Sequence, residues 1–330
     1  MLVTFIIVAY NEEKVIEKCF KSLNEQDYPH KDIEVILVDS NSQDKTKSLM
    51  LDFKEKYEHD YHVVKVLDNP KRILPCGWNV ALGQATGEAV VRVDAHTVFP
   101  KYFISNNVKE LEAGEDIVGG CCESITRDNT PWQRTLLVAE SSAFGAGVAD
   151  FRRKRGRQYV KSLAFAMYRK KVFDEVGTYN EKLARTEDNE IHYRMKRAGY
   201  KFLLSESITT QRYARGTLLG LIKQKFENGK WVGITMKYSP RCFSPYHFAP
   251  ICFVLAIIAG IILAVFNMPI PLIALGIAYG LFNLVSLIEA FRKNKFDIRY
   301  FFLPFILLVL HISYGVGTFI GFFKGLFMKK

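Results

Sequence analysis

The sequence predicts an α/β fold in which helices cover both faces of a parallel sheet, followed by a group of membrane-spanning helices. In the first hundred residues, short apolar runs rich in valine and isoleucine alternate with helical patterns. Such alternation is typical of a parallel sheet covered on both faces. In the last quarter of the chain, three long runs contain almost no charged residues, which indicates a membrane domain.

The predicted elements follow one another in a regular order. Apolar runs predict strands at residues 2–9, 33–38, 63–67, 89–93, 117–121, 160–168 and 202–204. Apolar residues at helical spacing predict helices at residues 15–23, 43–57, 76–82, 131–143, 183–198 and 217–238, and Pro100 opens one more. Residues 144–150 have the composition of a loop rich in glycine and alanine, and residues 152–157 are a basic run.

Polar side chains follow the first, second and fourth predicted strands, where these strands end. They are Asn11 and Glu12, Asp39, and Asp94. Ligands of parallel α/β sheets bind outside the carboxyl ends of the strands, so we expect these side chains to converge on one rim. Asp94 and His96 lie two residues apart, and such a pair suits a divalent cation that holds phosphate oxygens. The alternative is an aspartate that caps a turn beside an exposed histidine.

The chain is basic, with 330 residues and a formal net charge of +11. Together with the apolar runs, this charge favours an anionic membrane surface and phosphate-bearing substrates as partners, rather than nucleic acid. The six cysteines include no CxxC pair, so we expect free thiols in a reducing compartment. The first residues, LVTFIIVAY after Met1, predict a strand rather than a signal peptide.

Residues 248–266, 269–288 and 301–323 are each long enough to cross a hydrocarbon core of about 30 Å. The alternative is a set of buried core helices. Lysine and arginine precede the first run and fill the loop between the second and third, which places these segments and the N-terminal domain on the cytoplasmic side of the inner (plasma) membrane. Three full spans would leave the C-terminal lysines outside, so the third run, which contains proline and glycines, is either a span or a broken or re-entrant helix.

Four sequence blocks, in this order and at this spacing, resemble those of family-2 glycosyltransferases with the GT-A fold. They are FIIVAYNEE at residues 5–13, ILVDSNSQDKT at 36–46, VRVDAH at 91–96 and TEDNEIHYRMKRAGY at 186–200. The resemblance implies a Rossmann-like mixed sheet within a catalytic domain at residues 1–235, which includes an interfacial helix at about 217–235, and a membrane domain at residues 236–330. The subgroup that it resembles most assembles exopolysaccharides of the succinoglycan type and carries Asp-Ala-His in place of Asp-x-Asp.

The resemblance implies a UDP-sugar donor and a divalent metal ion, Mn²⁺ or Mg²⁺, at the rim. The metal is assigned to Asp94 and His96, and the histidine nitrogen favours Mn²⁺ if it binds the metal directly rather than through water or phosphate. Asp39 has the alternative role of a turn cap, Glu12 that of a carboxylate at a helix start, and Arg72 that of a solvated surface residue. The resemblance assigns the nucleotide-sugar to Ala9, Tyr10, Asn11, Glu12, Asp39, Arg72, Asn79 and Asp94.

Glu187 and Asp188 match the Glu-Asp pair of the family, whose aspartate is the catalytic base. Attack on an anomeric carbon requires that the acceptor hydroxyl lose its proton. Adjacent helical residues point about 100° apart, so only one of the two carboxylates faces the sugar. We expect it to be Asp188, in a single displacement with inversion. The alternative is an acidic cluster stabilised by the helix dipole.

Four further residues are assigned to the acceptor or to phosphate. Gln224 and Trp231 resemble part of the Gln-x-x-Arg-Trp motif of processive relatives, but the spacing is longer and the arginine is absent, so we do not expect processive synthesis. The alternative role of Trp231 is a membrane-interface anchor. Arg212 and Arg215 suit donor or lipid phosphates. The basic run at 152–157 is either a solvated loop or a site for a polyprenyl-diphosphate head group.

These features predict a membrane-anchored, metal-dependent inverting glycosyltransferase. It would move a hexose from a UDP-sugar to a lipid-linked saccharide on polyprenyl diphosphate, in the synthesis of an extracellular polysaccharide or another glycan. One alternative is a polyprenyl-phosphate sugar synthase, whose phosphate nucleophile needs no base. Another is a non-catalytic partner in a polysaccharide export complex.

Overall fold

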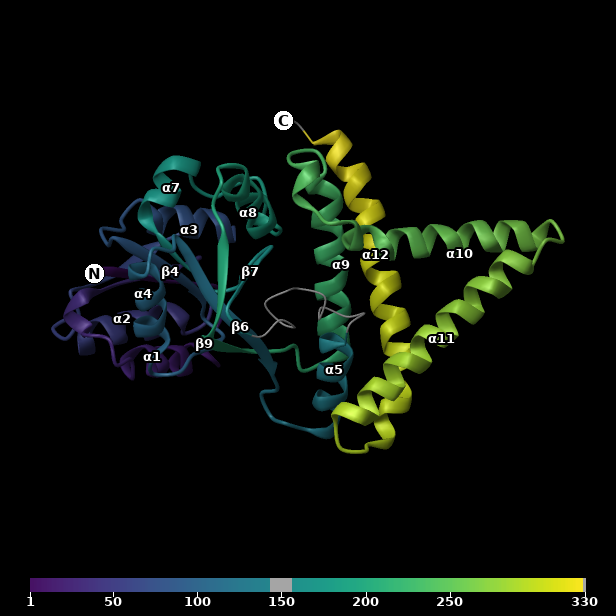
Figure 1. The fold of residues 1–330 in the computed structure, drawn as a ribbon, viewed down its shortest axis with the longest axis horizontal. Coiled ribbons are helices and arrows are strands. Elements are labelled where there is room, and N and C mark those ends of the chain that lie inside the picture. The colour runs from purple at the N-terminus through teal and green to yellow at the C-terminus, as the bar shows by residue number, and fades with distance from the viewer. Residues whose placement is uncertain (143–155, 329–330) are drawn as a thin grey trace. The chain divides into compact units, whose positions relative to one another are not determined.

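Figure 1 shows the computed structural model, which describes residues 1–142 and 156–328. Contacts divide the chain into two compact units. The first consists of residues 1–123 and 149–213, and the second of residues 124–148 and 214–330. The loop predicted at 144–150 and most of the basic run at 152–157 lie outside the described residues.

The first half of the sheet is parallel, as the alternating sequence pattern predicts. Its elements are β1 Val3–Ala9, α1 Ile16–Asn24, η1 His30–Asp32, β2 Ile33–Asp39, α2 Thr46–Tyr57, β3 Val63–Asp68, α3 Leu74–Leu82 and β4 Ala89–Asp94. The four strands lie in the order β3-β2-β1-β4. Ala9 pairs with Asp39, and Val8 pairs with Asp94. The carboxyl ends of β1, β2 and β4 therefore meet at one edge of the sheet.

The second half of the sheet is antiparallel. It comprises β5 Thr97–Val98, β6 Ile117–Ile125, β7 Gln158–Val160, β8 Met167–Arg169 and β9 Phe202–Tyr213. Strand β8 pairs with β4 and β6, and β9 pairs with β5 and β7. The two halves form one nine-stranded mixed sheet, which confirms the predicted fold class.

Two strand predictions in this half are wrong. The single strand predicted at residues 160–168 is two short strands, because Val160 pairs with β9 whereas Met167 pairs with β4 and β6. The strand predicted at 202–204 continues to Tyr213, because its polar second half pairs with β5 at the sheet edge.

The helix predicted at residues 183–198 is shorter than expected. It is α8 Glu187–Arg197, and the preceding Thr186 adopts a left-handed backbone conformation with a φ of 66°. This conformation is unfavourable for a β-branched residue and incompatible with a continuous helix. Two further helices of the first unit are α4 Phe103–Glu112 and α7 Lys170–Val176.

Helices cover both faces of the sheet. Apolar residues of α1, α2 and α4 pack on one face, and those of α3, α7 and α8 pack on the other. Val90 of β4 belongs to the second cluster. Because side chains alternate along a strand, Arg92 and Asp94 point to the same face as Val90.

The second unit is helical. Among the described residues, its helices are α5 Pro131–Ser141, α9 Leu218–Thr235, η2 Pro240–Cys242, η3 Pro245–Phe248, α10 Ala249–Val265, α11 Ile270–Lys293, η4 Ile298–Phe302 and α12 Leu303–Phe327. Three segments in the part of the chain that the structure describes are long and apolar enough to cross a membrane: Pro245–Val265, Ile270–Lys293 and Ile298–Phe327. The third apolar run forms one unbroken helix, α12. The segment at 217–235, which the sequence groups with the catalytic domain, forms α9 and packs along α12 within the second unit.

The contact between β6 and β9 leaves no room for a side chain at Gly120. A Cβ at this position would lie 1.6 Å from the carbonyl oxygen of Ile208. We therefore expect Gly120→Ala to lower the free energy of unfolding by about 2–3 kcal/mol, the usual cost of overpacking a core. Thermal and urea unfolding of the purified chain in detergent measure this change.

Gly83→Ala is the matched control. A Cβ there would lie 3.4 Å from its nearest neighbour, which is ordinary contact, so this variant should change the free energy of unfolding by less than about 1 kcal/mol. Equal effects of the two substitutions would contradict the close approach of β6 and β9.

Candidate active site

The turn after β1 is held against the turn after β2. Asn11 adopts a φ of 54°, its backbone N–H donates to Ser42 Oγ at 3.0 Å, and its Oδ1 accepts from the Gln43 N–H at 2.8 Å. Asp39 is buried, and its carboxylate accepts from the Ser42 N–H at 3.2 Å. The predicted residues 9–12 and Asp39 therefore lie together at the carboxyl edge of the sheet. The bond to Ser42 is also the turn-capping contact that is the alternative role of Asp39.

Tyr10 and Arg72 present exposed side chains at this edge. Tyr10 is 47% exposed, so its ring is accessible to a ligand. Arg72 adopts a φ of 58°. With the Asn41 amide oriented so that its oxygen faces Arg72, the Arg72 Nη2 and Nε atoms donate to that oxygen at 2.9 and 3.1 Å. Asn41 lies two residues beyond β2. The contact brings Arg72 from the segment after β3 to the turn after β2, with a guanidinium suited to phosphate.

Asp94, the last residue of β4, and His96, two residues further on, supply a pair of metal-binding atoms. His96 Nε2 lies 3.7 Å from Asp94 Oδ2, and His96 Nδ1 lies 3.3 Å from Glu12 Oε1. A hydrogen bond from Nδ1 to Glu12 leaves Nε2 free to face Asp94, which is how a neighbouring carboxylate orients a metal-binding histidine. Burial disfavours the charged ring, but the hydrogen bond to Glu12 and the charges of Asp94 and Glu12 outweigh it and raise the pKa of His96. A divalent cation at this position would compete with that proton.

The donor atoms at this edge fit a divalent cation that is shared with a substrate. Within residues 1–142 and 156–328, no three His, Cys, Asp or Glu side chains come together as a complete metal-binding group. Asp94 and His96 supply one oxygen and one nitrogen. Mg²⁺ in nucleotide enzymes takes one or two protein carboxylates and completes its shell with phosphate and water oxygens. The pair therefore suits a metal ion that binds together with a diphosphate.

Arg92 is a buried arginine that no sequence motif assigns to the site. It lies in β4, two residues before Asp94. Its guanidinium carbon lies 4.9 Å from the ring centre of Trp78 and 5.1 Å from that of Tyr179, and its Nη2 forms an ion pair with Asp188. A signal for it exists in the sequence, because a charge inside the apolar run VVRVD requires a partner. Arg92 connects the candidate metal edge to the candidate base.

The two carboxylates at the start of α8 lie in different surroundings. Glu187 is only 7% exposed, whereas the Asp188 side chain is 42% exposed. Burial and the charge of Asp188 raise the pKa of Glu187 well above its usual range. This shift favours the protonated form of Glu187, while Asp188 combines exposure with the ion pair to Arg92.

Backbone strain concentrates around these residues. Seven described non-glycine residues have a positive φ, and four of them belong to the segments above: Asn11, Asn41, Arg72 and Thr186. Such conformations cost about 1–3 kcal/mol each and gather at functional sites, where the surrounding structure holds them. Thr186 directly precedes the two carboxylates of α8, so this strain lies next to the candidate base.

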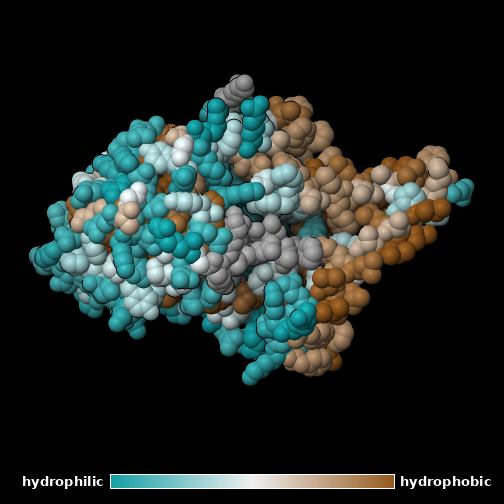
Figure 2. Space-filling view, viewed as in Figure 1, coloured by the Kyte–Doolittle hydropathy of each residue, from teal (hydrophilic) through white to brown (hydrophobic). Residues whose placement is uncertain are grey.

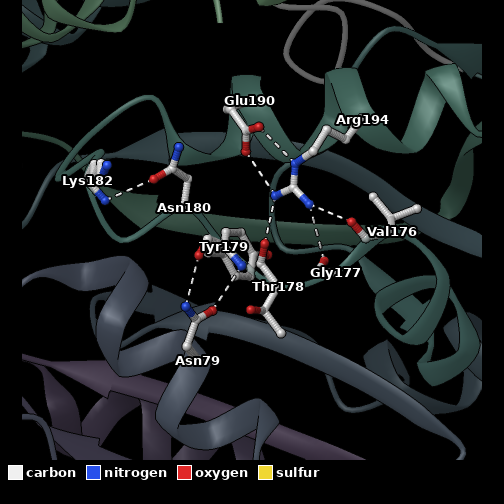
Figure 3. Close-up of polar contacts among 9 residues, drawn as sticks. All are labelled: Asn79, Val176, Gly177, Thr178, Tyr179, Asn180, Lys182, Glu190 and Arg194. Atoms are coloured by element: carbon white, nitrogen blue, oxygen red, sulfur yellow. Dashed lines mark hydrogen bonds and ion pairs between the residues drawn. The ribbon is translucent and has the colours of Figure 1, made fainter. Parts of the chain in front are cut away.

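The loop between α7 and α8 is fastened from two sides, as Figure 3 shows. From α8, Arg194 donates to the Thr178 carbonyl oxygen at 2.7 Å and pairs with Glu190 at 2.8 Å. From α3, Asn79 accepts from the Tyr179 N–H and donates to the Tyr179 carbonyl oxygen, both at 2.9 Å. These bonds fix the backbone of Tyr179, whose ring covers the buried guanidinium. The Asn79 amide, predicted to line the donor sugar, is thus engaged within the protein.

Of the four residues predicted for the acceptor or for phosphate, one lies in the first unit. Arg212 of β9 pairs with Thr97 of β5, the residue that follows His96. The other three belong to the second unit, and their part in the site stays a prediction: Arg215, Gln224 and Trp231.

Comparisons with known proteins agree on one family. A family model described as glycosyl transferase family 2 matches residues 4–177. A Methanococcus voltae protein, dolichyl N-acetyl-alpha-D-glucosaminyl phosphate 3-beta-D-2,3-diacetamido-2,3-dideoxy-beta-D-glucuronosyltransferase, is 24% identical over 333 residues, which cover 98% of both chains. Succinoglycan biosynthesis protein ExoA of Rhizobium meliloti (strain 1021) is 27% identical over 228 residues, which cover 68% of this chain and 67% of that protein.

A solved structure shares the fold. The mannosyltransferase PcManGT from Pyrobaculum calidifontis, in complex with GDP-Man and Mn²⁺, superposes with a TM-score of 0.60 at 20% identity. The match covers 96% of this chain and 87% of that one. At this identity the likeness establishes the fold, which is the predicted GT-A fold.

His192 of α8 makes the stability of the first unit depend on pH. Its Nε2 lies 2.9 Å from the Tyr168 hydroxyl. Burial, aided by the charge of Arg92, lowers the pKa of His192 from 6.5 to about 4. The unfolded chain binds this proton below about pH 6.5 and the folded chain only below about pH 4, so this contribution to stability is complete above pH 6.5 and is lost as the pH falls towards 4.

We therefore expect His192→Gln to lose about 2 kcal/mol less stability than the native chain when the pH is lowered from 7 to 5. Urea unfolding at the two pH values, followed by circular dichroism, measures the difference. The same pH dependence in both proteins would contradict a neutral, buried His192.

Proposed function

We propose a specific reaction for this chain, which belongs to glycosyl transferase family 2 and is a glycosyltransferase. It is a metal-dependent inverting enzyme that moves a hexose from a UDP-sugar to a lipid-linked saccharide on polyprenyl diphosphate. Its apolar C-terminal helices anchor it in the inner (plasma) membrane as a multi-pass protein, with the catalytic unit on the cytoplasmic side. Its product enters an extracellular polysaccharide or another glycan.

The position of Asp188 relative to Asp94 carries this proposal. Arg92 and Asp94 point to the same face of β4, and Asp188 is paired with Arg92. Two residues of a strand span about 7 Å, so the candidate metal ligand and the partner of the candidate base are close neighbours. A diphosphate at Asp94 and an acceptor hydroxyl at Asp188 can therefore flank one anomeric carbon.

The donor is proposed to bind along the carboxyl edge of the sheet. Residues 9–12 and Asp39 hold the nucleoside, and Arg72 and Arg212 supply positive charge for the phosphates. A divalent cation bound at Asp94 and His96 would stabilise the charge that develops on the departing diphosphate. The structure of PcManGT with GDP-Man and Mn²⁺ supports a nucleotide-sugar and a metal ion as ligands of this fold.

Transfer is proposed to be a single displacement assisted by Asp188. The acceptor hydroxyl donates a hydrogen bond to the Asp188 carboxylate. As the hydroxyl oxygen bonds to the anomeric carbon, its proton passes to Asp188 and the bond from that carbon to the diphosphate oxygen breaks. Attack opposite the leaving group inverts the anomeric configuration. Arg92, whose guanidinium lies over the rings of Trp78 and Tyr179, holds the carboxylate in place.

Glu187 is proposed to assist as a neutral neighbour. Its raised pKa favours the protonated form, which adds no second negative charge beside Asp188. Its buried carboxyl fixes the first turn of α8, so the direction of Asp188 is set by the packing of Glu187.

Relatives support a lipid-linked sugar as the acceptor. The name of the Methanococcus voltae enzyme describes transfer to a dolichyl-linked N-acetylglucosaminyl phosphate, and ExoA is named for succinoglycan biosynthesis. Both favour a saccharide hydroxyl as the nucleophile over the free phosphate of a polyprenyl-phosphate sugar synthase. Three residues near α9 are proposed to contact the acceptor or its phosphates: Arg215, Gln224 and Trp231.

Nucleotide release tests the proposed donor and metal. Membranes that contain this chain and native lipid-linked intermediates should release UDP from one member of a panel of UDP-sugars, with GDP-mannose as the competing donor. EDTA should abolish release, and added Mn²⁺ or Mg²⁺ should restore it. Asp94→Ala should lower the rate at least about 100-fold, and His96→Ala should lower it less. Mass spectrometry of the lipid fraction identifies the product.

Asp68→Ala is the matched control, because Asp68 is an exposed carboxylate at the end of β3, which is separated from β4 by two strands. It should leave the rate unchanged. Full activity of a folded Asp94→Ala protein would contradict the metal site. The absence of nucleotide release with every donor would favour a non-catalytic partner instead.

Substitutions of the two carboxylates of α8 test whether the acceptor is a hydroxyl or a phosphate. Asp188→Asn should lower kcat by about 100-fold or more, because the acceptor hydroxyl loses its base. Glu187→Gln should retain most of the activity, because glutamine has the shape of the protonated glutamate. Steady-state kinetics with the lipid-linked acceptor measure both. An Asp188→Asn protein that keeps its native kcat would favour a polyprenyl-phosphate sugar synthase, whose nucleophile is already ionised.

A further inference from the structure

One of the three apolar helices is packed differently from the other two. In α12, 39% of the most apolar stretch is buried within the protein, compared with 11% in α10 and 11% in α11. Figure 2 shows apolar surface along α10 and α11. The helix that covers α12 is α9, and Figure 1 shows the two side by side.

Helices α9 and α12 touch through their backbones and run in the same direction. A Cβ on Gly317 would lie 2.2 Å from the Phe226 carbonyl oxygen, which leaves no side chain between the helices there. Three contacts share an offset of 91 residues: Phe226 with Gly317, Lys230 with Gly321, and Lys237 with Met328. A constant offset means that positions advance together along both helices. The pair is therefore parallel.

Parallel packing restricts how these helices can be placed in a bilayer. If α9, α10, α11 and α12 all crossed the membrane, successive crossings would alternate in direction, and α9 and α12 would be antiparallel. They are parallel. Nor can α12 cross without α9, which lies against it from Leu221 to Ile234. If α10 and α11 both cross, α9 and α12 must both stay outside the hydrocarbon core.

The charges of these helices agree with this restriction. Helix α10 contains no charged residue, and α11 contains none before Glu289. Helix α9 carries four ionisable residues in its middle: Lys223, Lys225, Glu227 and Lys230. Ionisable side chains in a hydrocarbon core are costly, so α9 is unsuited to cross.

We propose, on the basis of the membrane anchoring proposed above, that the α10–α11 hairpin is the part of the described chain that crosses the bilayer. Helices α9 and α12 lie together along the cytoplasmic membrane surface. The partner of α12 is therefore a lipid surface, and α12 is not a third span.

Helix α12 presents an apolar stripe that suits such a surface. Its members lie seven residues apart and are 59%, 37%, 44% and 60% exposed: Phe305, Ile312, Phe319 and Leu326. Seven residues make nearly two helical turns, so these side chains share one face. Because α9 covers another side of α12, this stripe is a face of the α9–α12 pair that can lie against the acyl chains at the interface.

The basic residues fit an anionic lipid surface on one side of the membrane. A hairpin that crosses twice keeps the segments before α10 and after α11 on the same side, and an α12 that does not cross keeps its C-terminal end there too. A third span would place Lys324 on the outer side, against the usual excess of lysine and arginine on the cytoplasmic side. Without a third span, Lys324 follows that rule. The residues gathered on one side are Lys237, Arg241, Arg292, Lys293, Lys295, Arg299 and Lys324.

Cysteine labelling of the full chain tests the topology. Single cysteines replace three exposed residues, Asn267, Lys295 and Lys324, in a background where Cys242 and Cys252, the two cysteines that are not buried, are alanine. A membrane-impermeant maleimide is applied to sealed vesicles of each orientation. We expect Lys295→Cys and Lys324→Cys to react from one side and Asn267→Cys to react from the other.

Lys109→Cys, on the exposed face of α4, is the reference for the side of the catalytic unit. It should be labelled by the maleimide from the same side of the membrane as Lys295→Cys. Reaction of Lys324→Cys from the side of Asn267→Cys would mean that α12 crosses, and would overturn the proposal. Reaction of Asn267→Cys from the side of Lys295→Cys would mean that the hairpin does not cross, and would also overturn it.

Nitroxide labels on the stripe measure the depth of α12 directly. Labels at Phe305, Ile312, Phe319 and Leu326 should lie at one shallow depth in vesicles with anionic lipid, as judged by the ratio of oxygen to aqueous nickel-chelate accessibility. A spanning helix would place the middle two labels deep and the outer two shallow, which would overturn the proposal.

The topology and the proposed reaction can fail separately. Nucleotide release with Asp94→Ala and Asp188→Asn reports on the reaction, whereas labelling reports on membrane placement in any folded variant. A chain that labels as expected and releases no nucleotide would support the topology and contradict the proposed reaction. A chain that transfers sugar, but in which Lys324→Cys is labelled from the same side as Asn267→Cys, would support the proposed reaction and contradict the topology.

Discussion

The face of the sheet that carries the candidate site depends on one ion pair, between Arg92 and Asp188. A guanidinium inside a sheet strand is costly unless its charge and its flat faces are partnered. Here the carboxylate comes from α8, one aromatic ring from α3 and the other from the loop before α8. Loss of any partner leaves a buried charge poorly compensated, so the same residues support both the fold and the site.

This ion pair also sets the distance between the candidate base, Asp188, and the candidate metal ligand, Asp94. Because Arg92 and Asp94 belong to one strand, their spacing is a property of β-structure and does not depend on a loop. The loop that carries Tyr179 is fastened to α3 and α8, which limits how far Arg92 can move. The candidate site is therefore organised around β4, and the turns after β1 and β2 complete its edge.

The parallel half of the sheet was predictable from the sequence, because its strands are apolar runs that end in polar residues. The edge residues Asp39, Asp94 and His96 followed from that pattern. Arg92 could not be placed, since its partner Asp188 lies 96 positions away and is brought to it by the antiparallel half, whose short strands carry weak signals. The role of Asn79 in fixing a loop, and the packing of α9 on α12, likewise depend on contacts that no local pattern contains.

The backbone contact between α9 and α12 has a mechanical consequence. With glycines at the points of closest approach, the two helices cannot slide past each other by one residue without collision. A bilayer thinner than the hydrophobic length of the hairpin would be accommodated by tilting α10 and α11, while α9 and α12 shift as one rigid body. Hydrophobic mismatch would then be absorbed by the two lipid-facing helices and leave the geometry of α9 unchanged.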